Sequence, residues 1–401
     1  LGKELGFELR DAGPVLEIEL PGPEGAPVLG LAVHGDVVPA DPARWSFPPY
    51  AGLVKDGYVL GRGSSDDKNG IIQGLLAMKA LADSGIKRTH TVRMLVGSSE
   101  ESGSEDMQTY LKDHRAPDLT LVLVSSFPVV VGEKASNTLR IGSTTPHPLA
   151  RESGLRLVGL QAGLYPSIVA DEALLVLEGP KDRLEQGRQT LGQPMPETHL
   201  KVLLDGGKLE IRVLGRASHS GRELARGRNA LVSLAGVVAD ALPPGQAQEL
   251  LRFVRLVGRD PSGEALGLRS AMWGGYQVNP GQIRATEVGL ELALNIRRPP
   301  GLTKDQARAV LDQALMAFNQ KEGAALRALS FSGAAPMVFS EDSPIVQRLL
   351  RLFREAAGKR GKRMRRPDIT GSGSYAKAVP NAIPFGVWFT DRPYPGHSND
   401  E

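Results

Sequence analysis

The first 125 residues alternate short apolar runs with helix-like segments. The apolar runs are 28–33, 91–96 and 119–124, and the segments 69–84 and 104–114 between them carry helical patterns. Strands that are apolar along their whole length are typical of a parallel sheet whose two faces are covered by helices. We therefore expect an α/β domain with a mainly parallel sheet. In such sheets ligands bind beyond the carboxyl ends of the strands.

The pattern changes after Val131, and the chain of 401 residues is longer than a single hydrophobic core usually supports. From 138 to 332, alternating strands such as 209–213 mix with helices such as 303–320, which is typical of an α+β domain with an antiparallel sheet. We expect a first domain formed by 1–137 together with 333–401, with 138–332 inserted into it.

The composition of the chain excludes several kinds of site and argues against some partners. The chain has no cysteine, so disulfides, thiol catalysis and thiolate metal sites are excluded. Its 48 basic residues nearly balance 45 acidic ones, for a net charge of +3, and this does not favour a nucleic-acid partner. No apolar stretch is long enough to span a membrane. No signal peptide is visible, although the first residue is Leu1 rather than Met, and we expect a cytoplasmic protein without a membrane partner.

The densest basic run lies between 359 and 366 and follows a helix-like segment at 343–359. We interpret this run as a solvated loop. A patch for anionic partners is the alternative.

Acidic residues and histidines follow the ends of the apolar runs. They are His34, Asp36, Asp66, Glu100 and Glu101, with His397 near the end of the chain. Carboxylates and imidazoles that come from strand ends and loops can build a zinc site with a general base beside it.

The spacing within these groups supports metal binding but leaves alternatives open. His34 and Asp36 lie on the same side of an extended segment, where the carboxylate can orient a metal-bound imidazole. The pair could equally close a strand end, Asp66 could cap the following helix, and Glu100 and Glu101 could belong to a solvated loop. The glycine turn before Asp66 lacks the third glycine of a dinucleotide fingerprint.

Nine motifs in this order resemble the ArgE/DapE/aminoacylase family of di-zinc metallopeptidases, and most of all its PepV-type dipeptidases. They are HGDVVP, YVLGRGSSDDKNG, LVGSSEESGSEDM, FPVVVGEK, ASHSGRELARGRNA, NPGQI, LNIRRP, TGSGSYAKAVPNAIPFG and HSNDE. The resemblance covers nearly the whole chain. It implies a zinc-hydrolase catalytic domain and makes the inserted domain a lid that binds substrate.

The resemblance also implies a metal site with up to two zinc ions, with cobalt or manganese as alternatives. His34 would bind one ion, Asp66 would bridge both, and Glu101 and His397 would bind the second. Asp36 would orient His34, and Glu100 would act as the general base on a metal-activated water.

The remaining implied roles concern substrate. His219 would stabilise the tetrahedral intermediate, while Asn279 and Arg297 would hold polar groups of the substrate, with a carboxylate at Arg297. The loop residues Gly371, Ser372, Gly373 and Ser374 would line the site, where backbone N–H groups can bind a terminal carboxylate.

One position departs from the family pattern. The family carries an acidic zinc ligand three residues before its Phe-Pro-Val segment, and this chain has Val124 there. A valine cannot bind zinc, so the site on the His34 side is expected to be weakened. The chain also stops soon after His397, where relatives continue.

These observations predict a zinc-dependent dipeptidase. An N-acyl-amino-acid deacylase acting on acetyl or succinyl substrates is the alternative, because both enzymes cleave an amide next to a carboxylate. A catalytically weakened homologue or a peptide-binding protein would follow from Val124. The long insertion favours a monomer, with a homodimer as the alternative.

Overall fold

The computed structural model describes residues 1–145, 155–191 and 199–401. Contacts divide the chain into two compact units. Unit 1 comprises 1–135 and 334–401, and unit 2 comprises 136–333. In the described ranges, no helix combines the length and the apolar character needed to cross a membrane.

The main sheet of unit 1 contains six strands in the order β1-β2-β6-β3-β7-β20. These strands are β1 (Glu8–Asp11), β2 (Leu16–Leu20), β3 (Val28–His34), β6 (Thr91–Gly97), β7 (Leu119–Val122) and β20 (Ala382–Pro384). The four strands β6, β3, β7 and β20 pair in parallel, while β1 and β2 add an antiparallel edge. The expected mainly parallel α/β sheet is therefore confirmed.

Short strands and four helices complete unit 1. The strands are β4 (Leu53–Lys55), β5 (Tyr58–Leu60), β8 (Ser126–Phe127), β9 (Val130–Glu133), β18 (Met337–Val338), β19 (Asp368–Thr370) and β21 (Trp388–Phe389). The helices are α1 (Lys68–Asp83), α2 (Glu105–Asp113), α7 (Pro344–Ala356) and α8 (Gly358–Arg363). The segment 382–389 contains two short strands, because the chain leaves its pairing with β7 after Pro384 and pairs again, with β8, only at β21.

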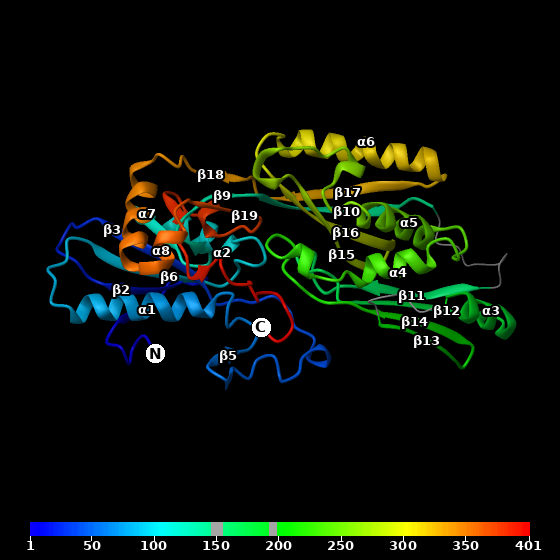
Figure 1. Cartoon of the computed structure of the whole chain (residues 1–401), viewed down its shortest axis with the longest axis horizontal. Helices are drawn as coiled ribbons and strands as arrows, with labels where there is room; N and C mark the ends of the chain where they lie inside the picture. Colours follow the sequence, from blue (N-terminus) through cyan, green and yellow to red (C-terminus); the bar gives the residue numbers. More distant parts are fainter. Residues whose placement is uncertain (146–154, 192–198) are drawn as a thin grey trace. The chain divides into compact units, whose positions relative to one another are not determined.

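Helices cover both faces of the central sheet, and the alternation of side chains along β3 shows why. Leu31 and Val33 belong to one apolar cluster with Met78 of α1, whereas Ala32 belongs to another with Met107 and Tyr110 of α2. Successive strand residues point to opposite faces, so a strand between two helical layers must be apolar throughout. Helix α1 can be followed along the sheet in Figure 1.

Among its described residues, unit 2 is built around an eight-stranded sheet in the order β13-β14-β12-β11-β15-β16-β10-β17. The strands are β10 (Ala135–Ser143), β11 (Arg156–Ala162), β12 (Glu172–Glu178), β13 (His199–Asp205), β14 (Lys208–Leu214), β15 (Gln277–Thr286), β16 (Gly289–Arg298) and β17 (Leu326–Gly333). The helices are α3 (Lys181–Leu191), α4 (Ala230–Val238), α5 (Gln246–Gly258) and α6 (Lys304–Glu322). Strand pairs such as β12–β14 and β15–β16 are antiparallel, and Leu234, Leu250 and Leu315 of α4, α5 and α6 share its apolar core.

The basic run differs from its interpretation as a loop. Its first part forms α8, which continues from α7 after a break at Ala357, where the backbone leaves the helical region. Gly361 is buried on the inner side of α8, while Lys362 and Arg363 are exposed. The run is therefore a solvated helix face followed by an irregular segment.

Truncation of the buried core should destabilise the protein far more than truncation of the surface. Leu95 of β6 is fully buried, and Leu95→Ala should lower the free energy of unfolding by about 2–5 kcal/mol because it leaves a cavity. Leu76 on α1 is 54% exposed, and Leu76→Ala should change it by no more than about 0.5 kcal/mol. Equilibrium urea denaturation of both variants measures the difference, and equal losses would contradict this description of the core.

Candidate active site

Four segments of unit 1 bring candidate ligands to the carboxyl end of the central sheet. Strand β3 ends at His34, which lies in register with Gly97 at the end of the parallel strand β6. The turn after β6 carries Glu100 and Glu101, and the loop before α1 carries Asp66. His397 arrives on the segment that follows β21. The candidate residues meet at one edge of the sheet, as expected, because neighbouring parallel strands end at the same edge.

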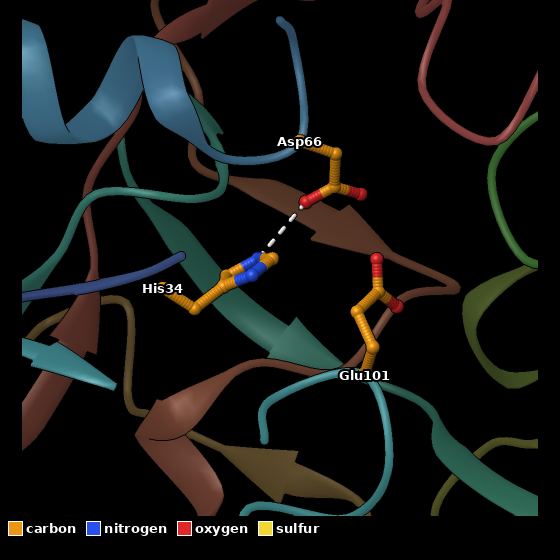
Figure 2. A group of neighbouring side chains, drawn as sticks. All are labelled: His34, Asp66 and Glu101. Carbon is orange, nitrogen blue, oxygen red and sulfur yellow. Dashed lines mark hydrogen bonds and ion pairs between the residues drawn. The ribbon is translucent and has the colours of Figure 1, made fainter. Parts of the chain in front are cut away.

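His34 is fully buried and is held from both sides of its ring. Its Nε2 lies 3.1 Å from Asp66 Oδ1. Its Nδ1 lies 3.0 Å from the carbonyl oxygen of Asp36 and 3.4 Å from the carboxylate oxygen Oδ1 of the same residue. Figure 2 shows the His34 ring and the carboxylates of Asp66 and Glu101 pointing toward one another.

Asp66 lies between two imidazoles. While Oδ1 faces His34, Oδ2 lies 3.4 Å from Nε2 of His397, and that nitrogen is 2.8 Å from Glu101 Oε1. His34, Asp66 and Glu101 each offer one potential ligand atom, and these three atoms lie within 4.8 Å of one another. The two oxygens of the Asp66 carboxylate therefore face two different imidazoles.

Asp36 connects β3 to the glutamate turn. Its Oδ1 and Oδ2 accept the backbone N–H groups of Glu100 and Glu101, each at 3.1 Å. The same side chain approaches His34, so one carboxylate orients the imidazole and fixes the backbone of both glutamates. The alternative in which Glu100 and Glu101 form a freely solvated loop does not fit these bonds.

A second acidic residue shapes the same turn and received no role in the sequence analysis. Asp106 Oδ2 accepts the N–H groups of Ser98 at 2.6 Å and Ser99 at 3.0 Å, and it also accepts the hydroxyl of Tyr375. A Cβ on Gly97 would lie 1.9 Å from that hydroxyl, so only glycine fits here. Asp106 lies within the SGSEDM motif, but its partner Tyr375 is far away in sequence, and the spacing alone could not reveal the bond.

Negative charge accumulates at the site because the carboxylates of Asp36, Asp66, Glu100 and Glu101 lie close together. Burial alone would lower the pKa of His34, but hydrogen bonds to Asp36 and Asp66 outweigh it and raise the pKa well above its usual value. Burial raises the pKa of Glu100 strongly against the attraction of His34, and the charge of Glu101 adds to the rise. Burial opposes a charged Asp66 too, but the two histidines hold the pKa of Asp66 below its usual range.

These residues fit a divalent metal ion such as zinc. The donors are imidazole nitrogens and carboxylate oxygens, the set that zinc uses when thiolates are absent. Burial first, and then the charges of neighbouring carboxylates, raise the pKa of Glu100, and a dication would relieve the repulsion among these carboxylates. Both oxygens of the Asp66 carboxylate face imidazoles. The alternative that the Asp66 side chain caps α1 therefore does not hold.

The position of the missing family ligand is apolar in this structure. Val124 is buried in the cluster that contains Leu95, Val122 and Tyr375. Asp66 Oδ1 faces His34, and Asp66 Oδ2 faces His397, which also contacts Glu101. Glu101 also offers an oxygen close to ligand atoms of His34 and Asp66, so Val124 adds no donor on either side.

His219 and Arg297 belong to unit 2. They are linked by Ser220, which follows His219 in the sequence and bonds to Arg297. Nδ1 of His219 accepts the N–H groups of Gly221 and Arg222, each at 3.0 Å. An accepting Nδ1 assigns the ring proton to Nε2. Nη2 of the buried Arg297 donates to Ser220 Oγ at 3.3 Å.

Asn279 in unit 2 uses its amide within the protein. Nδ2 donates to the carbonyl oxygens of Pro166 at 3.0 Å and Ile168 at 2.9 Å, and Oδ1 accepts from Asn229. Ile168 in turn pairs with His219 through the backbone. Asn279 thus holds the segment beside His219.

The loop from Gly371 to Ser374 follows β19 in unit 1. The N–H of Ser372 donates to Thr370 Oγ1 at 3.1 Å, and the N–H of Ser374 donates to the buried carboxylate of Glu133 at 3.0 Å. These two amides are engaged inside the protein. They cannot also serve a substrate carboxylate in this conformation.

Known protein families and sequences match this chain along nearly its whole length. Residues 30–401 match the sequence profile of Peptidase family M20/M25/M40. The chain is 27% identical over 388 residues to "Putative dipeptidase YtjP" of Bacillus subtilis (strain 168), covering 94% of this chain and 79% of that protein. It is 26% identical over 412 residues to a "Putative dipeptidase" of Staphylococcus epidermidis, covering 100% of this chain and 84% of that protein.

Solved structures share the fold. Human carnosine dipeptidase 1 superposes with a TM-score of 0.53 at 15% identity, covering 99% of this chain and 83% of that one. The dipeptidase Dug1p of Saccharomyces cerevisiae gives a TM-score of 0.54 at 13% identity, covering 99% and 84%.

Zinc should stabilise the chain more strongly as the pH rises from 6 to 9. Metal binding requires neutral imidazoles, and the pKa values of His34 and His397 are raised, so protons compete above the usual value near 6.5. Without metal, a raised folded pKa contributes stability below the unfolded pKa, and this contribution is lost as pH rises through the folded pKa. As the pH rises, both effects increase the difference in Tm between the zinc-loaded protein and the metal-free protein.

Thermal unfolding at several pH values, with zinc or with a chelator, measures this gap. His34→Ala should flatten its pH dependence, whereas His90→Ala, at an exposed position, should leave it unchanged. A gap that is constant from pH 6 to 9 in the unaltered protein would contradict the prediction.

Proposed function

Because the chain belongs to Peptidase family M20/M25/M40, we propose that this metallopeptidase is a zinc-dependent dipeptidase that hydrolyses the amide bond of dipeptides. The observation that carries the proposal is the carboxylate of Asp66 between His34 and His397, with Glu101 on His397. Two bacterial relatives bear the name dipeptidase, which supports the substrate class.

The metal would be held by His34, Asp66, Glu101 and His397. When bound at such sites, zinc acidifies a water molecule and polarises a carbonyl group. The protein contributes orientation, because Asp36 bonds both to His34 and to the backbone of the glutamate turn.

Glu100 is proposed as the general base. Burial and the neighbouring carboxylates raise its pKa, so its carboxylate has a high affinity for a proton. A base of this kind can take a proton from water and return it to the leaving amine. Its backbone N–H is fixed by Asp36, so its side chain starts from a defined position.

We propose roles for three residues of unit 2. A ring proton on Nε2 of His219 is a donor for an oxyanion that develops on the carbonyl oxygen. The guanidinium of Arg297, positioned by Ser220, is suited to the terminal carboxylate of the substrate. We propose that Asn279 contributes indirectly, by holding the Pro166–Ile168 segment against His219.

Val124 makes the two sides of Asp66 unequal. Catalytic zinc usually has three protein ligands, and Val124 leaves the His34 side without the acidic ligand of the family pattern, while His397 contacts both Glu101 and Asp66. We propose one tightly held ion coordinated by Asp66, Glu101 and His397, and a second, weakly held ion beside His34. A weakened activity relative to enzymes with a complete pair of sites follows from this difference.

Glu100→Ala should lower kcat on dipeptides by about 100- to 10,000-fold, because it removes the proton acceptor. Turnover of a dipeptide panel by zinc-loaded protein measures this effect, with acetyl and succinyl amino acids included. The matched control is Glu105→Ala, at an exposed glutamate in the first turn of α2. Equal turnover by Glu100→Ala and the unaltered protein would reject the base, and a preference for acyl amino acids would reject the dipeptidase assignment.

Val124→Asp should raise the tightly bound zinc from about one to about two ions per chain, since it supplies a carboxylate where Val124 is buried. Mass spectrometry of the metal content after dialysis measures the number. Val124→Asn is the control, because it has nearly the same shape but a neutral amide. Two tightly bound ions in the unaltered protein would contradict the proposed asymmetry, whether or not the variants fold.

A further inference from the structure

Arg62 and Glu401 form a buried ion pair next to the metal ligands, and neither has a role in the chemistry described above. The Arg62 side chain is 2% exposed and the Glu401 side chain is 0% exposed. Nη1 of Arg62 donates to Oε2 of Glu401. A buried pair of this kind is costly to desolvate and is weak evidence for a purely stabilising role.

The second oxygen of Glu401 contacts the backbone of the loop that carries Asp66. Oε1 accepts the N–H groups of Ser65 and Asp66, each at 3.0 Å. The carbonyl oxygen of Glu401 accepts the N–H of Gly61 at 2.6 Å. One residue therefore receives three backbone hydrogen bonds from the six residues that end at the proposed bridging ligand.

The other side of the pair is anchored independently. The backbone N–H of Arg62 donates to the carbonyl oxygen of Pro49 at 2.7 Å, and its guanidinium lies 5.1 Å from the ring centre of Trp45. The neighbouring Asp400 accepts both the N–H and the hydroxyl of Ser46, at 2.8 and 2.7 Å. The segment that carries His397 is thus fastened to the loop before β4.

We propose that Glu401 is a positioning residue, held by Arg62, that fixes Asp66 relative to His397. His397 lies four residues before Glu401 on one segment, while the Glu401 carboxylate binds the amide of Asp66 on the other. The spacing between two ligands from distant parts of the sequence then depends on one carboxylate. This inference rests on the proposed metal function.

Glu401 itself is not proposed as a metal ligand. Oε2 is bonded to Arg62 and Oε1 to two N–H groups, so both oxygens already have partners and the charge is neutralised. Groups that orient metal ligands in this way typically contribute about 10- to 100-fold to metal affinity.

The test measures the zinc Kd of the folded chain by competition with a chelator, together with the Tm of the metal-free protein. Glu401→Ala should raise the zinc Kd by about 10- to 100-fold, because the Asp66 loop loses its anchor. Glu401→Gln keeps an oxygen that can accept from Ser65 and Asp66 but loses the charge facing Arg62. It should raise the Kd by a smaller factor and so partly rescue the alanine variant.

Glu17 provides a matched control in the same unit. It is a buried carboxylate on β2 whose side chain accepts from Tyr110 and from Arg10, the latter at 3.2 Å, and neither partner is a candidate metal ligand. Glu17→Ala should lower the Tm but leave the zinc Kd of the folded protein unchanged. A residue that acts only on stability would behave in this way.

Two outcomes would overturn the inference: a zinc Kd within twofold of the unaltered protein for Glu401→Ala, or an equal rise in Kd for Glu17→Ala. If Glu401→Ala does not fold, Glu401→Gln decides, and an unchanged Kd in that variant contradicts the role of the ion pair. Failure of the unaltered protein to bind zinc would instead reject the proposed function.

Discussion

The arrangement of the site depends on Asp66, a carboxylate held between two buried histidines. Each of its oxygens faces one imidazole, and Glu101 joins on the His397 side. Several acidic groups can remain so close in a buried site only if positive charge compensates them. The histidines do this in part, which is why the pKa of His34 rises while the pKa of Asp66 falls. The surrounding bonds of Asp36, Asp106 and Glu401 go mainly to backbone N–H groups, so they orient segments without adding ligands.

The sheet and the main cluster could be predicted because both follow from local pattern. Apolar runs such as 28–33 indicated strands buried on two faces, and the structure confirms the α/β class with an inserted antiparallel sheet. The order of motifs indicated the peptidase family, which the family comparison confirms. The roles assigned to individual residues, from His34 to Arg297, stay predictions. The sequence pattern predicted an inserted domain at 138–332, and the contacts in the structure assign 136–333 to unit 2.

Other features depend on partners that no spacing reveals. Arg62 and Glu401 both lie in motifs, but their pairing joins positions at opposite ends of the sequence. The amide of Asn279 is used by carbonyl groups of an irregular segment, which has no periodic signal. The basic run contains Gly361, and glycine disfavours a helix, so the local pattern could not show that the first part of the run forms α8. In each case tertiary contacts decide, and these contacts are distant in sequence.

The division of unit 1 between two ends of the sequence has a consequence for how the molecule is made. During synthesis, the strands β3, β6 and β7 emerge early, but β20, which pairs with β7, and the segment with His397 emerge only after the whole of unit 2. The nascent amino-terminal half therefore exposes an incomplete sheet edge while the insertion is translated. Long-range pairing of this kind is slow and leaves intermediates prone to aggregation. The candidate ligands His34 and His397 therefore cannot come together until the last part of unit 1 has been made.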